Sequence, residues 1–159
     1  MIIKAACYGR VSVEEQAREG VSLDAQRAKI EAYCMLHDIE LVSYHEDAGI
    51  SGKAMDNRDG LQTCLGELRE GKANALIVLK LDRLSRSTKD VLELSDLFQR
   101  EGWALHSISE KLDTSTAAGR FVLTILAALA QMEREQIGER TSMALQYKKS
   151  RGERLGTTP

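Results

Sequence analysis

The segment ALIVLKL, residues 75–81, is the sequence feature that most restricts the fold. A short, continuous apolar run of this kind is typical of a central strand in a parallel sheet that is covered on both faces. Similar runs recur along the chain and alternate with stretches whose apolar residues follow a helical period. The pattern predicts strands over residues 2–8, 39–45, 75–81 and 103–109, and helices over 23–37, 60–70 and about 88–100. It indicates an α/β fold with a mainly parallel sheet flanked by helices.

The last third of the chain has a different pattern, typical of one long helix. From residue 117 to about 151 there is no proline, and apolar residues recur close to the helical period at Val122, Ile125, Leu126, Leu129, Met132 and Ile137. Such a helix would be about 50 Å long, too long to be covered by one small domain, so we expect a partner helix on its apolar face. Gly138 is a candidate bend.

The length and composition fit one compact folded unit. The chain has 159 residues, of which 29% are charged and 43% are apolar. The apolar runs are too short to cross a bilayer, and the N-terminus lacks a signal-peptide pattern, so a cytoplasmic location is expected. We expect an α/β core over residues 1–116, the long helix over 117–151 and a boundary at 152–159, where "GERLGTTP" suggests that a longer protein continues.

Polar side chains follow three of the expected strands where each of them ends. The first strand leads into Tyr8, Arg10 and Ser12, the second into Asp47, and the third into Asp82, Arg83 and Arg86. The carboxyl ends of parallel strands meet at one edge of a sheet, so these side chains should lie together. Arginines match phosphate oxygens, and a serine hydroxyl among them could attack phosphorus. Each motif alone is more typical of a salt-bridged turn or a helix cap, and only their convergence indicates a phosphate-handling site.

Other site chemistries find little support. No histidine lies near Ser12 as a protease-like triad would need, and no G-x-x-x-x-G-K-[ST] loop is present. Cys7, Cys34 and Cys64 lie among apolar residues without metal-ligand spacing and are expected to be buried thiols. The net charge of −2 argues weakly against nucleic acid, but the chain ends in a basic segment. This segment is either a DNA contact or a solvated helix end, and it contains Arg140, Lys148, Lys149, Arg151 and Arg154.

Four ordered motifs resemble those of the serine recombinases of the resolvase/invertase group. They are "YGRVSVEEQ", "DAGISG" with the later Arg58, "KLDRLSR" and "TILAALAQMEREQIGERT". The resemblance covers nearly the whole chain. It implies a site-specific DNA recombinase that cleaves DNA through a 5′-phosphoserine intermediate, exchanges strands and religates them, without a metal or ATP. The longer first loop and the exit segment "GERLGTTP" favour the large serine recombinase branch.

The resemblance also implies a role for individual residues. Ser12 would be the nucleophile, with Arg10, Arg83 and Arg86 holding the scissile phosphate. Asp82 would orient the arginines or assist proton transfer, and Gln16 would support the serine loop. The pocket would be completed by Arg58, entering from the loop before it, and by Tyr8 and Asp47.

The same comparison gives the long helix two roles. It would pair protomers into a homodimer and then a synaptic homotetramer, with an interface containing Leu129, Met132, Glu133, Arg134 and Glu139. Its basic far end would lie against duplex DNA. Two alternatives stay open: a catalytically inactive DNA-binding synapsis or regulatory protein of the same fold, and a phosphate-binding α/β module of receiver or phosphatase type. Intact Ser12 and arginines argue against the first, and the long helix argues against the second.

Overall fold

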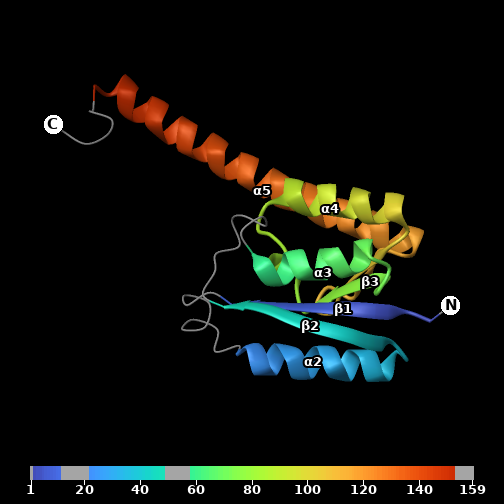
Figure 1. Ribbon diagram of the computed structural model, residues 1–159. Helices are drawn as coiled ribbons and strands as arrows, with labels where there is room; N and C mark the ends of the chain where they lie inside the picture. The colour runs from blue at the N-terminus through green and yellow to red at the C-terminus, as the bar shows by residue number, and fades with distance from the viewer. Residues whose placement is uncertain (1, 12–21, 49–57, 153–159) are drawn as a thin grey trace.

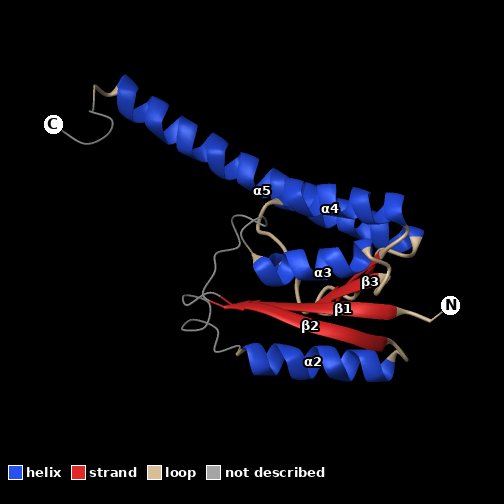
Figure 2. Cartoon of the chain, viewed as in Figure 1, coloured by secondary structure: helices blue, strands red, loops and turns tan. Residues whose placement is uncertain are grey.

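The fold is built on a five-stranded sheet with the strand order β2-β1-β3-β4-β5. The computed structural model describes residues 2–11, 22–48 and 58–152. The first four strands in this order pair in parallel, and β5 is antiparallel to β4. The strands are β1 (Lys4–Val11), β2 (Glu40–Ala48), β3 (Ala75–Val78), β4 (Ala104–Ser107) and β5 (Leu112–Asp113). The predicted mainly parallel α/β fold is therefore confirmed (Figure 2).

Helices cover both faces of this sheet (Figure 1). Among the helices of the described residues, α2 (Leu23–Leu36) lies on one face and three further α-helices lie on the opposite face. These are α3 (Asp59–Arg69), α4 (Thr88–Glu101) and α5 (Ala117–Ser150). Side-chain caps define several helix starts, since the Ser87 hydroxyl accepts from the Asp90 amide at 3.4 Å and the Thr116 hydroxyl accepts from the Gly119 amide at 2.9 Å. Gly102 ends α4 in the left-handed conformation, with φ 78°.

The sheet separates two apolar clusters. On the α3 and α4 side, Tyr8, Leu61 and Phe98 are fully buried. On the α2 side, the cluster contains Cys7, Ile30 and Cys34, with Cys64 in the opposite cluster. All three cysteines are free and buried, as the sequence predicted. Because residues of β1 alternate between the two clusters, this strand is packed from both sides and holds its carboxyl end in a defined place.

Element boundaries differ from the predicted ones mainly at the carboxyl ends of the strands. β1 and β2 run on to Val11 and Ala48, so Arg10 and Asp47 lie inside strands. β3 stops at Val78, and the apolar run continues into the short 3-10 helix η1 (Leu81–Arg83). The sequence pattern missed η1 and β5, because a two-residue strand and a single helical turn are too short to show a period.

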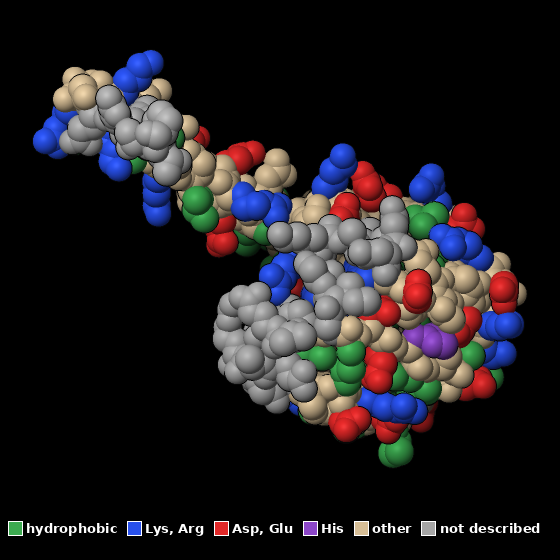
Figure 3. All heavy atoms as spheres, turned by 60° about the vertical axis from the view of Figure 1, so that its left-hand side comes forward, with side chains coloured by type: hydrophobic (Ala, Val, Ile, Leu, Met, Phe, Trp, Pro, Cys, Tyr) green, Lys and Arg blue, Asp and Glu red, His purple; other side chains and the backbone are tan. Residues whose placement is uncertain are grey.

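The long helix α5 is one continuous element of 34 residues. It begins in tight contact with β5: a Cβ on Gly119 would lie 1.7 Å from the Asp113 carbonyl oxygen, so only glycine fits there. Gly138 lies within the helix without ending it, so α5 does not break where a bend was expected. The only buried residues of α5 are Leu123 and Ala127. The first half of the helix lies alongside α4, whereas its second half projects from the core (Figure 1), and Lys and Arg side chains gather at its far end (Figure 3).

Many apolar side chains of α5 are exposed. They include Phe121, Val122, Ile125, Leu126, Leu129, Met132 and Ile137. Leu123 and Ala127 cover the neighbouring core, while this exposed apolar stripe lies on another side of the helix. Across the described ranges, none of the helices combines the length and apolar character that a membrane span requires.

Candidate active site

The carboxyl ends of β1, β2 and β3 bring together those of the predicted site residues that the structure describes. Arg10 and Asp47 are direct partners in the register of the parallel strands β1 and β2. On the other side of β1, β3 leads into η1, which carries Asp82 and Arg83. The convergence that the sequence predicted is therefore a property of the strand order β2-β1-β3.

Arg10 and Arg83 hold each other's segments through main-chain carbonyls. Arg10 donates from Nε to the carbonyl oxygen of Arg83 at 3.2 Å and from Nη2 to that of Asp82 at 2.6 Å. In return, Arg83 donates from Nη1 to the carbonyl oxygen of Arg10 at 2.7 Å. Both side chains are buried, and such charge-assisted bonds are stronger than neutral ones. This reciprocal pair joins the end of β1 to η1.

Asp82 stands beside this pair. Its Oδ1 atom accepts from Nε of Arg83 at 3.1 Å, and its side chain is about half exposed, at 45%. The contact orients the Arg83 guanidinium and leaves the carboxylate in reach of solvent. This geometry fits the orienting role that the family resemblance implies for Asp82.

Arg58 immediately precedes α3 and is fully buried. Its Nη1 atom donates to the Arg83 carbonyl oxygen at 2.7 Å, and Nη2 donates to the carbonyl oxygen of Leu84. The guanidinium also lies over the Tyr8 ring, 5.8 Å from its centroid. Arg58 therefore braces η1 from the α3 side.

Tyr8 and Asp47 join β1, β2 and the start of α3. The Tyr8 hydroxyl donates to Asp47 Oδ2 at 2.7 Å, and the same carboxylate accepts from the amides of Gly60 at 3.0 Å and Leu61 at 3.3 Å. Burial, together with the hydrogen bond to Asp47, raises the pKa of the Tyr8 phenol. Tyr8 thus stays protonated and serves as a donor, while Asp47 satisfies amides at the beginning of α3.

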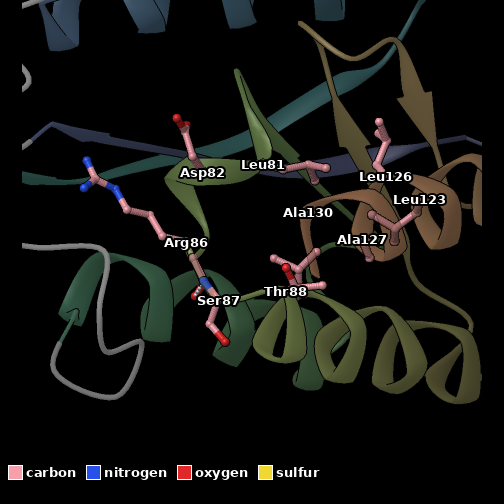
Figure 4. Close-up of a pocket in the computed structure, with 11 residues that line it drawn as sticks. Leu81, Asp82, Arg86, Ser87, Thr88, Leu123, Leu126, Ala127 and Ala130 are labelled. Carbon is pink, nitrogen blue, oxygen red and sulfur yellow. Dashed lines mark hydrogen bonds between the residues drawn. The ribbon is translucent and has the colours of Figure 1, made fainter. Parts of the chain in front are cut away.

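Arg86, three residues after Arg83, is exposed to solvent and lies beside a pocket of about 430 Å³. The walls of the pocket are formed by η1, by the start of α4 and by the part of α5 that faces them. Figure 4 shows Asp82 and Arg86 on one side and Leu123, Leu126 and Ala127 of α5 on the other. The pocket therefore connects the candidate active site with the long helix.

Sequence reasoning missed Gln26, whose side-chain amide brackets the backbone of Arg10. Gln26 Oε1 accepts from the Arg10 amide at 3.3 Å, and its Nε2 donates to the Arg10 carbonyl oxygen at 3.1 Å. The available signal was the i, i+4 spacing of Gln26, Ile30 and Cys34, which are the buried residues of α2.

The other predicted residues are either outside the described part of the chain or on and just after α5. Ser12, Gln16 and Arg154 fall outside the described residues. Of the basic segment, Arg140, Lys148, Lys149 and Arg151 are exposed on α5 and just after it, far along the chain from the strand ends.

The residues expected at a protomer interface lie along the middle of α5. Leu129, Met132, Glu133, Arg134 and Glu139 are all exposed. Arg134 also contacts the beginning of α4 within the same chain. Its guanidinium donates to the Arg86 carbonyl oxygen at 3.5 Å and to the Thr88 hydroxyl. This contact links the middle of α5 to the backbone of the Arg86 segment.

Sequence comparisons connect the chain with one family of DNA-processing proteins. The model of the resolvase N-terminal domain matches residues 5–154. The Tn917 transposon resolvase of Enterococcus faecalis is 36% identical over 137 residues, which cover 86% of this chain and 71% of the resolvase. The DNA-invertase hin of Salmonella typhimurium is 44% identical over 110 residues, which cover 69% of this chain and 56% of the invertase. The chain thus spans little more than half the length of the invertase.

Solved structures give the same result. The N-terminal catalytic domain of TP901-1 integrase matches with a TM-score of 0.72 and 37% identity, covering 84% of this chain and 98% of that domain. A resolvase family site-specific recombinase from Streptococcus pneumoniae matches with a TM-score of 0.67 and 32% identity, covering 93% of this chain and 99% of the recombinase. The relatives come from bacteria, transposons and phages. The chain therefore belongs to the resolvase N-terminal domain family, whose members are site-specific DNA recombinases of the serine type.

Proposed function

We propose that this chain is the catalytic domain of a site-specific DNA recombinase and that Ser12 is its nucleophile. The observation that carries the proposal is the reciprocal clasp of Arg10 and Arg83 at the carboxyl edge of the sheet. It concentrates positive charge at the carboxyl end of β1. Ser12 follows Arg10 by two residues in the sequence. A buried pair of guanidinium groups at this edge is suited to the charge of a phosphodiester and of its transition state.

In the proposed reaction, the Ser12 hydroxyl attacks the scissile phosphorus. A bond forms between Oγ and phosphorus while the bond from phosphorus to the 3′ oxygen breaks. The proton lost by the serine is balanced by the one that the departing 3′ oxygen takes up, which leaves a free 3′ hydroxyl and a 5′-phosphoserine ester. Attack by a 3′ hydroxyl on the ester reverses the step and religates the DNA, so the bond energy is conserved.

The arginines divide into two groups in this proposal. Arg86, exposed beside the pocket with Asp82, meets the DNA backbone first. Arg10 and Arg83 stabilise the negative charge that develops on the phosphate. Their guanidinium groups now donate to main-chain carbonyl oxygens, so DNA binding has to weaken some of these hydrogen bonds. Arg58, with Tyr8 and Asp47, keeps η1 in place behind them. Gln16 supports the serine loop.

We further propose that α5 carries both the duplex DNA and the second protomer. The core over residues 1–116 would hold the phosphate, and the helix over 117–151 would lead to the boundary at residues 152–159 and to a further DNA-binding region. Phosphate contacts would come from the basic far end, with Arg140, Lys148, Lys149, Arg151 and Arg154. The exposed apolar stripe would pair two protomers, and two such dimers would form the synaptic tetramer.

Replacing Met132 by glutamate is expected to shift a dimer toward monomer. Met132 lies in the exposed apolar stripe and is 46% exposed, so a charge there would be buried without a partner on pairing. We expect at least a tenfold weaker dimer, equivalent to about 1.4 kcal/mol, measured by sedimentation equilibrium. Thr124→Glu is the matched control, because Thr124 is exposed on α5 outside the apolar stripe. Equal dimer constants for both variants would argue that the stripe is not the interface.

The proposed activity is tested by covalent capture of DNA. The full-length protein is mixed with a pool of duplexes of randomised sequence, and DNA that stays attached to protein in detergent is amplified and selected again. We expect enrichment of a common sequence, and mass spectrometry of the digested adduct should place the attached nucleotide on the peptide that contains Ser12. The arrangement of the enriched sites then distinguishes integration, excision, resolution and inversion.

The same experiment separates catalysis from the non-catalytic alternative. A synapsis or regulatory protein of this fold would enrich a sequence by reversible binding in native gels but retain no DNA in detergent. Attachment at a residue other than Ser12 would show that the nucleophile is wrongly assigned.

A further inference from the structure

We propose that Glu110, a residue that the sequence did not single out, positions the catalytic arginine segment by clamping the start of η1. Its carboxylate accepts from the amide of Leu81, at 3.3 Å to Oε1 and 3.4 Å to Oε2. Ser107 donates its hydroxyl to Oε1 of the same carboxylate. Glu110 therefore joins the end of β4 to the residue that immediately precedes Asp82 and Arg83.

The turn that carries Glu110 is itself tied to the end of β3. The amide of Ile108 donates to the Val78 carbonyl oxygen at 3.1 Å, and the amide of Ser109 donates to that of Leu79 at 2.8 Å. Ser107 is buried, at 1% exposure, and pairs in register with Val78. The carboxylate is therefore presented from a turn that hydrogen bonds anchor to the sheet.

The clamp replaces a helix cap that the local sequence does not supply. η1 begins after Lys80, whose side chain makes no capping bond. The first amides of a helix lack partners within it, and a carboxylate is a favourable acceptor for them. Glu110 provides that acceptor from 29 residues away in the chain.

η1 is therefore held from two directions. Glu110 binds the amide at its beginning, while Arg10 and Arg58 donate to the carbonyl oxygens of Asp82, Arg83 and Leu84. Leu81 also packs its side chain against the apolar cluster on the α3 and α4 side and against a smaller cluster of Val91, Leu112 and Leu123. Loss of the clamp would let the start of η1 shift, and a displacement of about 1 Å at a catalytic group can cost about 100-fold in rate.

This inference rests on the proposed function, and its test uses the duplex recovered by covalent capture. We expect Glu110→Ala to slow covalent-complex formation by about 10- to 100-fold. Glu110→Gln should stay within about threefold of the unaltered protein, because its amide oxygen can still accept from Leu81. Glu101→Ala, which removes an exposed glutamate at the end of α4, is the control and should leave the rate unchanged. A Glu110→Ala rate equal to that of the unaltered protein, or a Glu110→Gln variant as slow as Glu110→Ala, would overturn the positioning role.

A second measurement is independent of activity. Hydrogen exchange of the Leu81 amide, followed by NMR, should be at least tenfold faster in Glu110→Ala, while amides of β1 stay protected. Unchanged exchange would overturn the clamp. If the unaltered protein captures no DNA, the proposed function is wrong, and Glu110 then has no role in cleavage. The exchange rate of the Leu81 amide would still show whether the Glu110 clamp exists.

If Glu110→Ala does not fold, Ser107→Ala decides instead. This variant keeps the carboxylate and removes the hydroxyl that holds it. We expect a threefold to tenfold slower covalent step and faster Leu81 exchange, and an unaltered rate and exchange would overturn the proposal.

Discussion

Replacing Ser12 by alanine in the full-length protein is expected to abolish the covalent protein–DNA complex. The hydroxyl is the proposed attacking group, and without it the arginine cluster can bind a phosphodiester but cannot form an ester with it. We expect the rate of strand cleavage to fall by roughly 1,000-fold or more. Reversible DNA binding should change little, because the basic end of α5 is untouched.

The measurement is a denaturing gel of the captured duplex with Ser12→Ala beside the unaltered protein, and a native gel for binding. Ser115→Ala serves as the control, since Ser115 is an exposed serine next to the start of α5 and should leave both gels unchanged. Cleavage by Ser12→Ala at an appreciable rate would show that another group attacks the phosphate.

Replacing Arg58 by methionine is expected to lower the free energy of unfolding by about 3 kcal/mol. The guanidinium donates to the carbonyl oxygens of Arg83 and Leu84. The Arg83 oxygen keeps a bond from Arg10, but the Leu84 oxygen loses its donor. Each hydrogen bond to a charged group contributes about 1.5–3 kcal/mol, and an unsatisfied buried acceptor costs about 1–3 kcal/mol. Methionine keeps much of the apolar stem but supplies no donor. Because η1 loses its brace from α3, covalent-complex formation should also slow markedly.

Urea unfolding, followed by the fluorescence of the single tryptophan, measures this change. Trp103 lies against Phe98 in the core, with ring centroids 5.5 Å apart, so its emission reports on the packed state. Arg69→Met is the matched control, because Arg69 is exposed at the end of α3 and should change stability by less than about 0.5 kcal/mol. A loss below 1 kcal/mol for Arg58→Met would contradict the bracing role.

The order of strands and helices was predictable because it depends on local patterns. The apolar run at residues 75–81 and the helical spacing of residues 88–100 both produced elements at the expected places. The exact ends were less predictable. β3 stops at Val78 because the following residues are drawn into η1 by contacts from Arg10, Arg58 and Glu110, none of which is a neighbour in sequence.

Part of the candidate site was predictable from the sequence, but its arrangement was not. Arg10, Asp47 and Arg83 were expected together because parallel strands end at one edge, and they lie there. The partners of Arg58 could not be predicted, because arginines are mostly exposed and its burial depends on the carbonyl oxygens of Arg83 and Leu84 and on the Tyr8 ring. The assignments of Ser12 as nucleophile and Gln16 as its support stay predictions.

By itself, the sequence determined the α/β order, the long helix and the set of chemical groups at the strand ends, because periodicity and residue type are local properties. Only the tertiary structure decided which guanidinium groups face carbonyls, which carboxylate holds η1, and that Gln26 brackets Arg10. These contacts are hydrogen bonds between residues up to 73 positions apart. The groups come within bonding distance only when the sheet has formed and excluded water from its edge.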